Sequence, residues 1–291
     1  MSETTKLAND GKGSSSTPPP LGSKPKNSSV AAVMVDRRPT THITLQSKGG
    51  VGKTFVASLV AQWIIENGRA LRCYDADPGN QSFCARVPAY DPVRVPIRDL
   101  ETGHVVVSKL DEMMQAALTE DRDVVVDGGA SSFNDLADYL IRSNVSEMVQ
   151  EYDRRLVIHS VITGGPDTTE TLGGLIALLN SLPPPTEIMV WLNEQPSGSM
   201  TFGDAANFKE TKVYQDYRDQ IVGVVTLRRY EGFFLQDILW MLEKHLTFEQ
   251  AIGTGGKLGP AGIMRGQRLK QIRRRIWDQL GNVLPLGGGV Q

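Results

Sequence analysis

Apolar residues along the middle of the chain fall in short continuous runs, and amphipathic stretches separate these runs. The runs are rich in β-branched side chains and predict strands at HITLQ (42–46), ALRCYD (70–75), DVVVD (123–127), RLVIHSVIT (155–163), EIMVWLN (187–193) and QIVGVVTL (220–227). Helices are predicted between them over residues 53–67, 131–142, 168–182 and 233–244. Strands that are apolar throughout are typical of a parallel sheet covered on both faces. The pattern therefore predicts an α/β fold with a doubly wound, mostly parallel sheet and helices on both faces.

Both ends of the chain depart from this pattern. Residues 1–40 are rich in Ser, Pro and Lys and have too few large apolar side chains to offset ordering entropy, which predicts a disordered tail. The alternating pattern then predicts one domain over residues 41–252. Residues 253–291 are expected to form a glycine-rich linker, GTGGKLGPAG, and a basic amphipathic helix, RGQRLKQIRRRIWDQL. The apolar face of that helix is expected to hold Leu269, Ile272, Ile276 and Leu280.

Composition and charge narrow the class of protein. With 291 residues, 40% of them hydrophobic, and a net charge of -2, the chain is an ordinary globular protein rather than a globally basic nucleic-acid coat. Its two cysteines, Cys73 and Cys84, have no CxxC spacing, which argues against a zinc site, a disulfide framework or an iron-sulfur cluster. No apolar window is long enough to span a membrane and no secretory signal is present, so a cytoplasmic protein is predicted.

The segment LQSKGGVGKTFVASLVAQW (45–63) joins the first predicted strand to the first predicted helix. Gly49, Gly50 and Gly52 lack Cβ atoms, so the backbone can turn tightly and direct N–H groups at phosphate oxygens. The start of the helix adds partial positive charge at the same place. Lys53 is then expected to reach the β- and γ-phosphates, and the Thr54 hydroxyl to bind Mg²⁺. The segment therefore predicts a phosphate-binding loop.

One departure from the pattern GxxxxGK[ST] is informative. The pattern requires glycine at position 47, where this chain has Ser47, and a second lysine, Lys48, comes directly before Gly49. The form KGGVGKT resembles the deviant Walker A motif of the ParA and MinD type of ATPases. That resemblance implies a P-loop NTPase fold and ATP bound by Lys48, Gly49, Gly50, Val51, Gly52, Lys53, Thr54 and Phe55. It also implies that Lys48 reaches across a nucleotide-sandwich dimer, which would make dimerisation depend on ATP.

Three later segments are similar to parts of the same family. YDADPGNQSF resembles its switch I region, which implies that Asp75 supports Mg²⁺ through water and that Asp77 orients the attacking water. DVVVDGGASSF resembles switch II, with Asp127 as the Walker B aspartate; a buried carboxylate there is costly without a cation, which favours Mg²⁺. MVWLNEQ ends in Asn193, where relatives read the purine ring with an amide.

Each of these assignments has a plainer alternative on the residues alone. The two acids of YDADPGNQSF can cap a strand and a turn, the acid of DVVVDGG can lie in a solvated loop, and an asparagine suits any turn. The six basic residues of the last helix also leave the choice open between a solvated face, DNA phosphates, an anionic membrane surface and a partner protein. They are Arg265, Arg268, Lys270, Arg273, Arg274 and Arg275.

From about His42 to Ile252 the chain resembles the TraL or StbB type of plasmid-encoded conjugation and stability ATPases, on segments that include DGGASSF, RLVIHSVITGG and LTFEQAI. This implies a slow, Mg²⁺-dependent ATP hydrolase that acts as a dimerisation switch in conjugative transfer or plasmid stability. Lys48, Lys53 and Asp77 would be its catalytic residues. The alternative is a nucleotide-gated DNA-binding or positioning adaptor for plasmid segregation in which hydrolysis is not essential.

The same resemblance sets the expected partners. They are a second copy of the chain in the presence of ATP, and plasmid DNA or a conjugation or partition protein. An anionic membrane surface is a further candidate, so the cytoplasmic location extends to the nucleoid or the inner membrane surface. No small-molecule substrate other than the nucleotide is expected.

Overall fold

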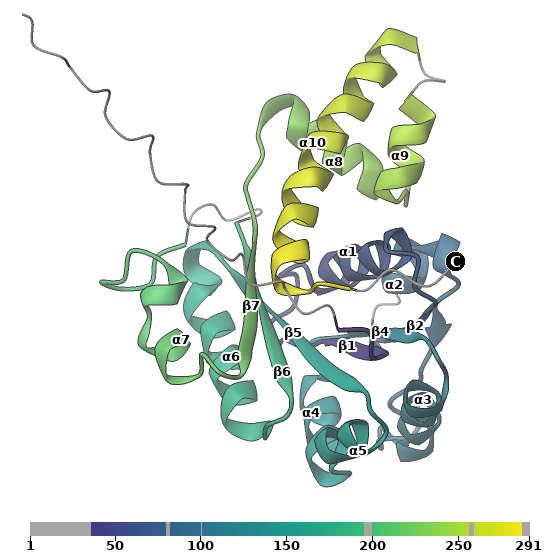
Figure 1. Cartoon of the computed structure of the whole chain (residues 1–291), viewed down its shortest axis with the longest axis vertical. Coiled ribbons are helices and arrows are strands. Elements are labelled where there is room, and N and C mark those ends of the chain that lie inside the picture. Colours follow the sequence, from purple (N-terminus) through teal and green to yellow (C-terminus); the bar gives the residue numbers. More distant parts are fainter. Residues whose placement is uncertain (1–35, 80–81, 100, 195–199, 256–258, 287–291) are drawn as a thin grey trace, which may run out of the picture. The chain divides into compact units, whose positions relative to one another are not determined.

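A computed structural model describes residues 36–79, 82–99, 101–194, 200–255 and 259–286 (Figure 1). Its strands form one seven-stranded sheet in the order β3-β2-β4-β1-β5-β6-β7, and all neighbouring strands are parallel. The strands are β1 (Thr40–Thr44), β2 (Leu71–Ala76), β3 (Val93–Arg94), β4 (Asp123–Gly128), β5 (Arg155–Thr163), β6 (Glu187–Asn193) and β7 (Ile221–Leu227). The predicted doubly wound parallel sheet is confirmed, and β3 is a short edge strand that the sequence pattern did not indicate.

Helices cover both faces of the sheet (Figure 1). One face is covered by α1 (Lys53–Glu66), α2 (Ser82–Arg86), α8 (Gly232–Glu243), α9 (Phe248–Gly255) and α10 (Gly259–Val283). The other face is covered by α3 (Val107–Thr119), α4 (Phe133–Arg142), α5 (Val145–Glu151), α6 (Thr168–Ser181) and α7 (Lys212–Asp216). Short 3-10 turns lie at Pro88–Tyr90, Gly165–Asp167 and Phe208–Glu210.

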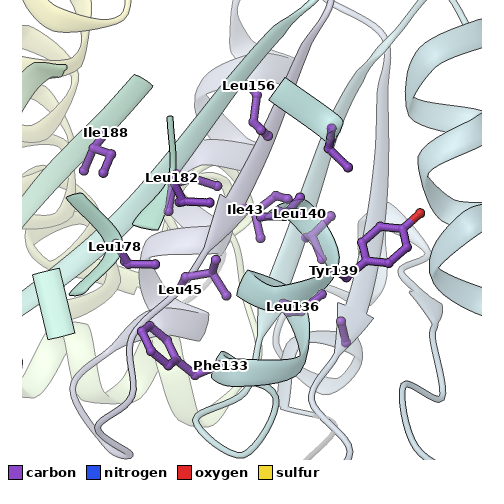
Figure 2. Close-up of a cluster of buried hydrophobic side chains, with 14 of the residues drawn as sticks. Ile43, Leu45, Phe133, Leu136, Tyr139, Leu140, Leu156, Leu178, Leu182 and Ile188 are labelled. Atoms are coloured by element: carbon purple, nitrogen blue, oxygen red, sulfur yellow. The ribbon is translucent and has the colours of Figure 1, made fainter. Parts of the chain in front are cut away.

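The strands are apolar along their whole length because both of their faces are buried. All five residues of β1 are buried, as are eight of the nine in β5. Figure 2 shows one side of this core, where Ile43 of β1 and Leu45, the residue after β1, lie beside Leu136 and Leu140 of α4. Each large side chain buried in this way contributes about 1.5–3 kcal/mol relative to its exposed state.

The helix α3 was missed by the sequence prediction although its pattern is helical. Its buried residues recur at intervals of three and four, which places them on one face. They are Leu110, Met113, Met114, Ala117 and Leu118. The short helices α2, α5, α7 and α9 were also missed, and packing on the sheet rather than length stabilises elements of this size.

The predicted boundary of the N-terminal tail needs correction. The predicted tail, residues 1–40, lies outside the described residues as far as residue 35. Asp36, by contrast, forms a parallel bridge with Leu286 and ion pairs with Arg38 and Arg155, at 2.7 and 3.3 Å. The first strand then begins at Thr40, so residues 36–40 belong to the folded part of the chain.

The glycine-rich linker was also predicted too long. Helix α9 continues to Gly255 and α10 begins at Gly259, upstream of the predicted start at Arg265; residues 256–258 lie outside the described residues. The predicted apolar face of α10 is buried, with Leu269 and Leu280 at 0% exposure. This face packs with α1, α8, α9 and β7, because the sheet would otherwise leave its β7 side uncovered.

Two histidines and a tryptophan form a hydrogen-bonded chain inside the sheet, beneath α1. The Trp191 Nε1–H donates to His159 Nδ1 at 2.9 Å, and His159 Nε2 lies 3.0 Å from His42 Nδ1. Because the indole only donates, His159 must carry its proton on Nε2 and His42 must accept it. His42 Nε2 then carries a buried proton that no described atom accepts. The three side chains are at most 1% exposed, so they are core residues and not a surface site.

Candidate functional site

The predicted site residues meet at the carboxyl edge of the sheet. Thr44, just before the glycine loop, is paired with Asp127 of β4, and Asp127 is paired in turn with Asp75 of β2. On the other side of β1, Asn193 ends β6. In open parallel sheets ligands bind at this edge, where strand order reverses. The fold therefore brings together residues that are far apart in the sequence.

The glycine loop between β1 and α1 has the geometry of a phosphate cradle. Gly50 and Gly52 have φ angles of 74° and 103°, in the left-handed region that favours glycine. Gly49 and Gly50 are exposed, so this side of the loop is open to solvent. The Lys53 side chain is 8% exposed and its Nζ donates to the Lys48 carbonyl at 2.7 Å. Burial lowers the Lys53 pKa, although Asp127 and Asp77 act in the opposite direction.

Ser47, the departure from the usual loop pattern, is accommodated by a small residue on α6. Its hydroxyl donates to Gln46 Oε1 at 3.1 Å, and a Cβ added to Gly174 would lie 2.0 Å from that oxygen. The Gln46 amide also donates to the carbonyls of Val161 and Thr171, both at 2.9 Å. Gln46 thus fixes the start of the loop to β5 and α6, a role that no sequence pattern indicated.

Thr54 and Asp127 face each other across the site. The Thr54 hydroxyl lies 2.6 Å from Asp127 Oδ2 and 2.7 Å from the Ser82 hydroxyl, while Thr44 donates to Asp127 Oδ1 at 2.8 Å. Asp127 is 2% exposed. Burial raises its pKa to about 6, against the lowering effect of hydrogen bonds from Thr54 and Thr44. Nearby Asp75 raises it further, so the carboxylate lies where a cation would be stabilising.

This donor set fits Mg²⁺ in the presence of phosphate. Mg²⁺ prefers oxygen ligands and is usually held by one or two carboxylates or hydroxyls together with substrate phosphates. Thr54 and Asp127 supply a hydroxyl and a carboxylate within one hydrogen-bond length. Among the described residues no group of three or more His, Cys, Asp or Glu side chains could hold a metal alone. The protein therefore offers part of a Mg²⁺ site that a nucleotide would complete.

The two aspartates at the end of β2, Asp75 within the strand and Asp77 just after it, have different surroundings. Asp75 is fully buried, and its Oδ2 accepts the N–H groups of Phe83 and Cys84, at 3.1 and 2.9 Å, at the start of α2. Asp77 is half-buried and accepts the Gly79 N–H at 3.0 Å. The Asp77 carboxylate lies directly over Gly129, since a Cβ there would be 2.3 Å from Oδ1. Only glycine at position 129 leaves room for this side chain beside the loop that follows Asp127.

Asn193 contacts the glycine loop itself. Its Nδ2 donates to the Val51 carbonyl at 2.8 Å, and a Cβ on Gly52 would lie 2.8 Å from the same nitrogen. The side chain is 6% exposed. In this structure the amide holds the loop to the end of β6, and its predicted part in reading a purine stays a prediction.

Lys48 is held by two acids at the start of α6. Its Nζ lies 2.9 Å from Glu170 and 3.4 Å from Asp167, and hydrogen bonds from these acids raise its pKa, Glu170 more than Asp167. The side chains of Lys48, Asp167 and Glu170 are 32%, 41% and 56% exposed. Ion pairs this exposed are weak and can be exchanged for other contacts. Neither acid was expected from the sequence, because both are far from Lys48 along the chain.

Three of the six basic residues predicted on α10 pair with acids on other helices. Arg265 and Arg268 both pair with buried Asp237 of α8, at 3.3 and 2.5 Å, and Arg273 pairs with Glu66 of α1 at 3.4 Å. The remaining basic residues, Lys270, Arg274 and Arg275, are exposed. Three of the six predicted basic residues therefore dock the helix, and the other three lie on its exposed side, where Arg274 pairs with Asp278 at 3.8 Å.

The buried histidines predict that acid destabilises the fold. Burial lowers the pKa of His159 to about 3 and that of His42 well below its usual value of 6.5. Below about pH 6.5 only the unfolded chain binds these protons, so each histidine lowers the free energy of unfolding by about 1.4 kcal/mol per pH unit. The pKa of Asp127 is raised from 3.8 to about 6, so between these pH values the folded chain binds a proton at Asp127 that the unfolded chain does not. Over this range Asp127 cancels the loss of stability caused by one of the two histidines.

Urea unfolding between pH 7.5 and 5 measures this effect. We expect a net loss of roughly 1.4 kcal/mol per pH unit below about pH 6, and a steeper loss in Asp127→Asn, which removes the opposing carboxylate. A free energy of unfolding that stays constant between pH 6.5 and 5 in both proteins would contradict the buried, neutral state of the two imidazoles.

The fold and the site define a class of protein: a P-loop fold, with a parallel sheet, a glycine loop, its lysine and threonine, and aspartates at the ends of adjacent strands. The chain is 33% identical over 241 residues to Protein TraL of Escherichia coli, covering 82% of this chain and 96% of that protein. It is 30% identical over 247 residues to another Escherichia coli Protein TraL, with coverage of 84% and 98%. The chain belongs to the TraL family, which confirms the predicted recognition.

Solved structures with some similarity are more distant. The MinC:MinD cell division protein complex of Aquifex aeolicus has a TM-score of 0.45 and 14% identity, over 85% of this chain and 98% of that chain. A putative plasmid partition protein from Borrelia burgdorferi B31 bound to AMPPNP has a TM-score of 0.37 and 14% identity, over 81% and 98%. No protein-family model matches the chain. In the described part of the chain, no helix is both long and apolar enough to cross a membrane.

Proposed function

We propose that the protein is an ATP-dependent dimerisation switch with slow, Mg²⁺-dependent ATPase activity, acting in plasmid conjugative transfer or plasmid stability. The observation that carries the proposal is the placement of the two loop lysines. Lys53 is buried and donates to the Lys48 carbonyl within the loop, whereas Lys48 lies at the surface and pairs only weakly with exposed acids. The burial of Lys53 supports a role in its own site, and the exposure of Lys48 supports a contact with a neighbouring chain.

The remaining residues take the roles that their positions support. The loop N–H groups and Lys53 would bind the phosphates of ATP, and Thr54 and Asp127 would hold Mg²⁺, with Asp75 behind them. Mg²⁺, when bound, would neutralise charge on the phosphates. Asp77, over Gly129, would orient the attacking water, and Lys48 would leave Asp167 and Glu170 for the phosphates of a partner subunit. Plasmid DNA, or a transfer or partition protein, is the proposed downstream partner.

The dimer is tested by size measurement of the full chain without nucleotide, with ADP and with Mg²⁺ and a non-hydrolysed ATP analogue. We expect a dimer only with the ATP analogue, and a monomer in all three conditions for Lys48→Ala, because the cross-subunit charge contact is lost. Lys109→Ala is the matched control, since Lys109 is also an exposed lysine paired with an acid, Glu112 at 2.7 Å. A wild-type chain that stays monomeric with the saturating analogue, even with plasmid DNA present, would overturn the proposal.

A further inference from the structure

Hydroxyl groups flank the Thr54–Asp127 pair on both sides. On one side, the Ser82 oxygen lies 2.7 Å from the Thr54 oxygen, and the Thr54 hydroxyl lies 2.6 Å from Asp127 Oδ2. On the other side, Thr44 donates to Asp127 Oδ1 at 2.8 Å, and the Thr44 oxygen accepts the Gly128 N–H at 3.3 Å. These contacts form one continuous hydrogen-bonded chain from α2 to β1, with the two proposed Mg²⁺ ligands at its centre.

The direction of each hydrogen bond in this chain follows from the carboxylate. An ionised carboxylate only accepts, whereas a hydroxyl has one proton to donate and two lone pairs that accept. The proton of Thr54 therefore goes to Asp127, and at the contact with Ser82 the Thr54 oxygen must accept. Ser82 occupies one lone pair of Thr54 in this way and leaves the other for a metal ion. Thr44 similarly fixes the second carboxylate oxygen of Asp127.

The two outer hydroxyls are held in place by the fold. Ser82 is the first residue of α2, and the N–H groups of the next two residues donate to Asp75 Oδ2, at 3.1 and 2.9 Å. Thr44 is 1% exposed and is the residue of β1 that is paired with Asp127 in the sheet. A buried carboxylate therefore fixes one hydroxyl, and the strand register fixes the other.

We propose that Ser82 and Thr44 are positioning residues for Mg²⁺, which orient the Thr54 hydroxyl and the Asp127 carboxylate without binding the ion themselves. Partners of this kind, one hydrogen bond behind the metal ligands, orient those ligands and tune metal affinity. Asp75, which holds the start of α2, supports the Thr54 side of the site through Ser82. The inference rests on the proposed function in one respect, the binding of Mg²⁺ by Thr54 and Asp127. It goes beyond it by assigning the Mg²⁺ affinity to residues outside the ligand pair.

The test measures how strongly Mg²⁺ raises the affinity of the full chain for ADP, by calorimetry over a series of Mg²⁺ concentrations and in EDTA. Ser82→Ala and Thr44→Val each remove one hydroxyl, and valine keeps the shape of threonine. We expect the Mg²⁺ concentration that gives half of the effect to rise by about tenfold or more in each variant, because the loss of such a partner typically costs about 10- to 100-fold in metal affinity. ADP affinity in EDTA should stay at the wild-type value.

Conservative variants separate this role from a merely structural one. Ser82→Thr and Thr44→Ser keep the hydroxyl and should retain the wild-type response to Mg²⁺. Thr41→Val is the matched control, since Thr41 is also a buried threonine of β1, at 2% exposure, but is paired with Val124. Circular dichroism and thermal unfolding establish that each variant is folded. If Thr44→Val does not fold, Ser82→Ala decides, since Ser82 is only half-buried.

A wild-type response to Mg²⁺ in the folded Ser82→Ala and Thr44→Val proteins would overturn the inference. An equal loss of ADP affinity with Mg²⁺ and in EDTA would do the same, because it would mean that the changes disturb the glycine loop and not the metal site. A wild-type chain whose ADP affinity does not respond to Mg²⁺ would instead refute the proposed Mg²⁺ site.

Discussion

Lys53→Ala is expected to abolish productive nucleotide binding. Lys53 is the buried lysine of the loop, and its removal would leave bound phosphates without this close positive partner. Removing one member of a buried, hydrogen-bonded charge pair costs about 2–5 kcal/mol, which corresponds to roughly 30-fold to several-thousand-fold weaker ATP binding. Calorimetry with Mg²⁺-ATP measures the affinity, and steady-state phosphate release measures the activity, which should fall to background.

The control for this change is Lys270→Ala, which removes an exposed lysine from the outer side of α10. It should leave ATP affinity and phosphate release as in the wild type. Phosphate release that persists in Lys53→Ala would be decisive against the assignment of the loop as the ATPase site, because no hydrolysis by this site is expected without the lysine.

Asp77→Asn is expected to separate binding from hydrolysis. The amide keeps the size of the side chain and an oxygen for the Gly79 N–H, so the position over Gly129 should be retained. It removes the carboxylate that is proposed to orient the attacking water, and the loss of such a group is expected to lower the rate by about 10²- to 10⁴-fold. Single-turnover phosphate release should fall by that factor while ATP affinity changes by less than about threefold.

Asp138→Asn serves as the control, since Asp138 is an acid on α4 whose side chain is 65% exposed. Equal hydrolysis by Asp77→Asn and the wild type would remove Asp77 from the proposed catalytic role.

The same variant also tests whether hydrolysis is needed for the biological function. Normal conjugation frequency and plasmid stability in an Asp77→Asn strain with impaired hydrolysis would favour the nucleotide-gated adaptor over the ATPase switch.

The sequence alone predicted the central part of the site because the residues of that part are close together along the chain. The order of strand, glycine loop, lysine, threonine and helix is contiguous, and each residue type performs its task within a few residues of the next. Asp75 and Asp127 could be placed at the same edge because parallel strands present their carboxyl ends together. The same reasoning failed for β3, which is too short to show a period, and for α3, whose helical period was present but was not identified.

The residues that the sequence did not indicate are those whose partners are distant. Gln46 is fixed by carbonyls of β5 and α6, and Ser47 fits because Gly174 lies opposite it. Both contacts depend on β5 being the neighbour of β1, which is a matter of strand order. Periodicity predicts that a segment is a strand and which face it buries, but it carries no information about its neighbours.

The sequence by itself determined the class of fold, the position of the glycine loop and that of the acids at the ends of β2 and β4, because these depend on local order and on a shared strand direction. The tertiary structure decided that Asp167 and Glu170 hold Lys48, that Asn193 holds the loop, and that α10 docks on α1. Each of these contacts joins segments more than a hundred residues apart. Only the order of strands in the sheet, and the packing of helices on it, brings such segments within a few ångströms.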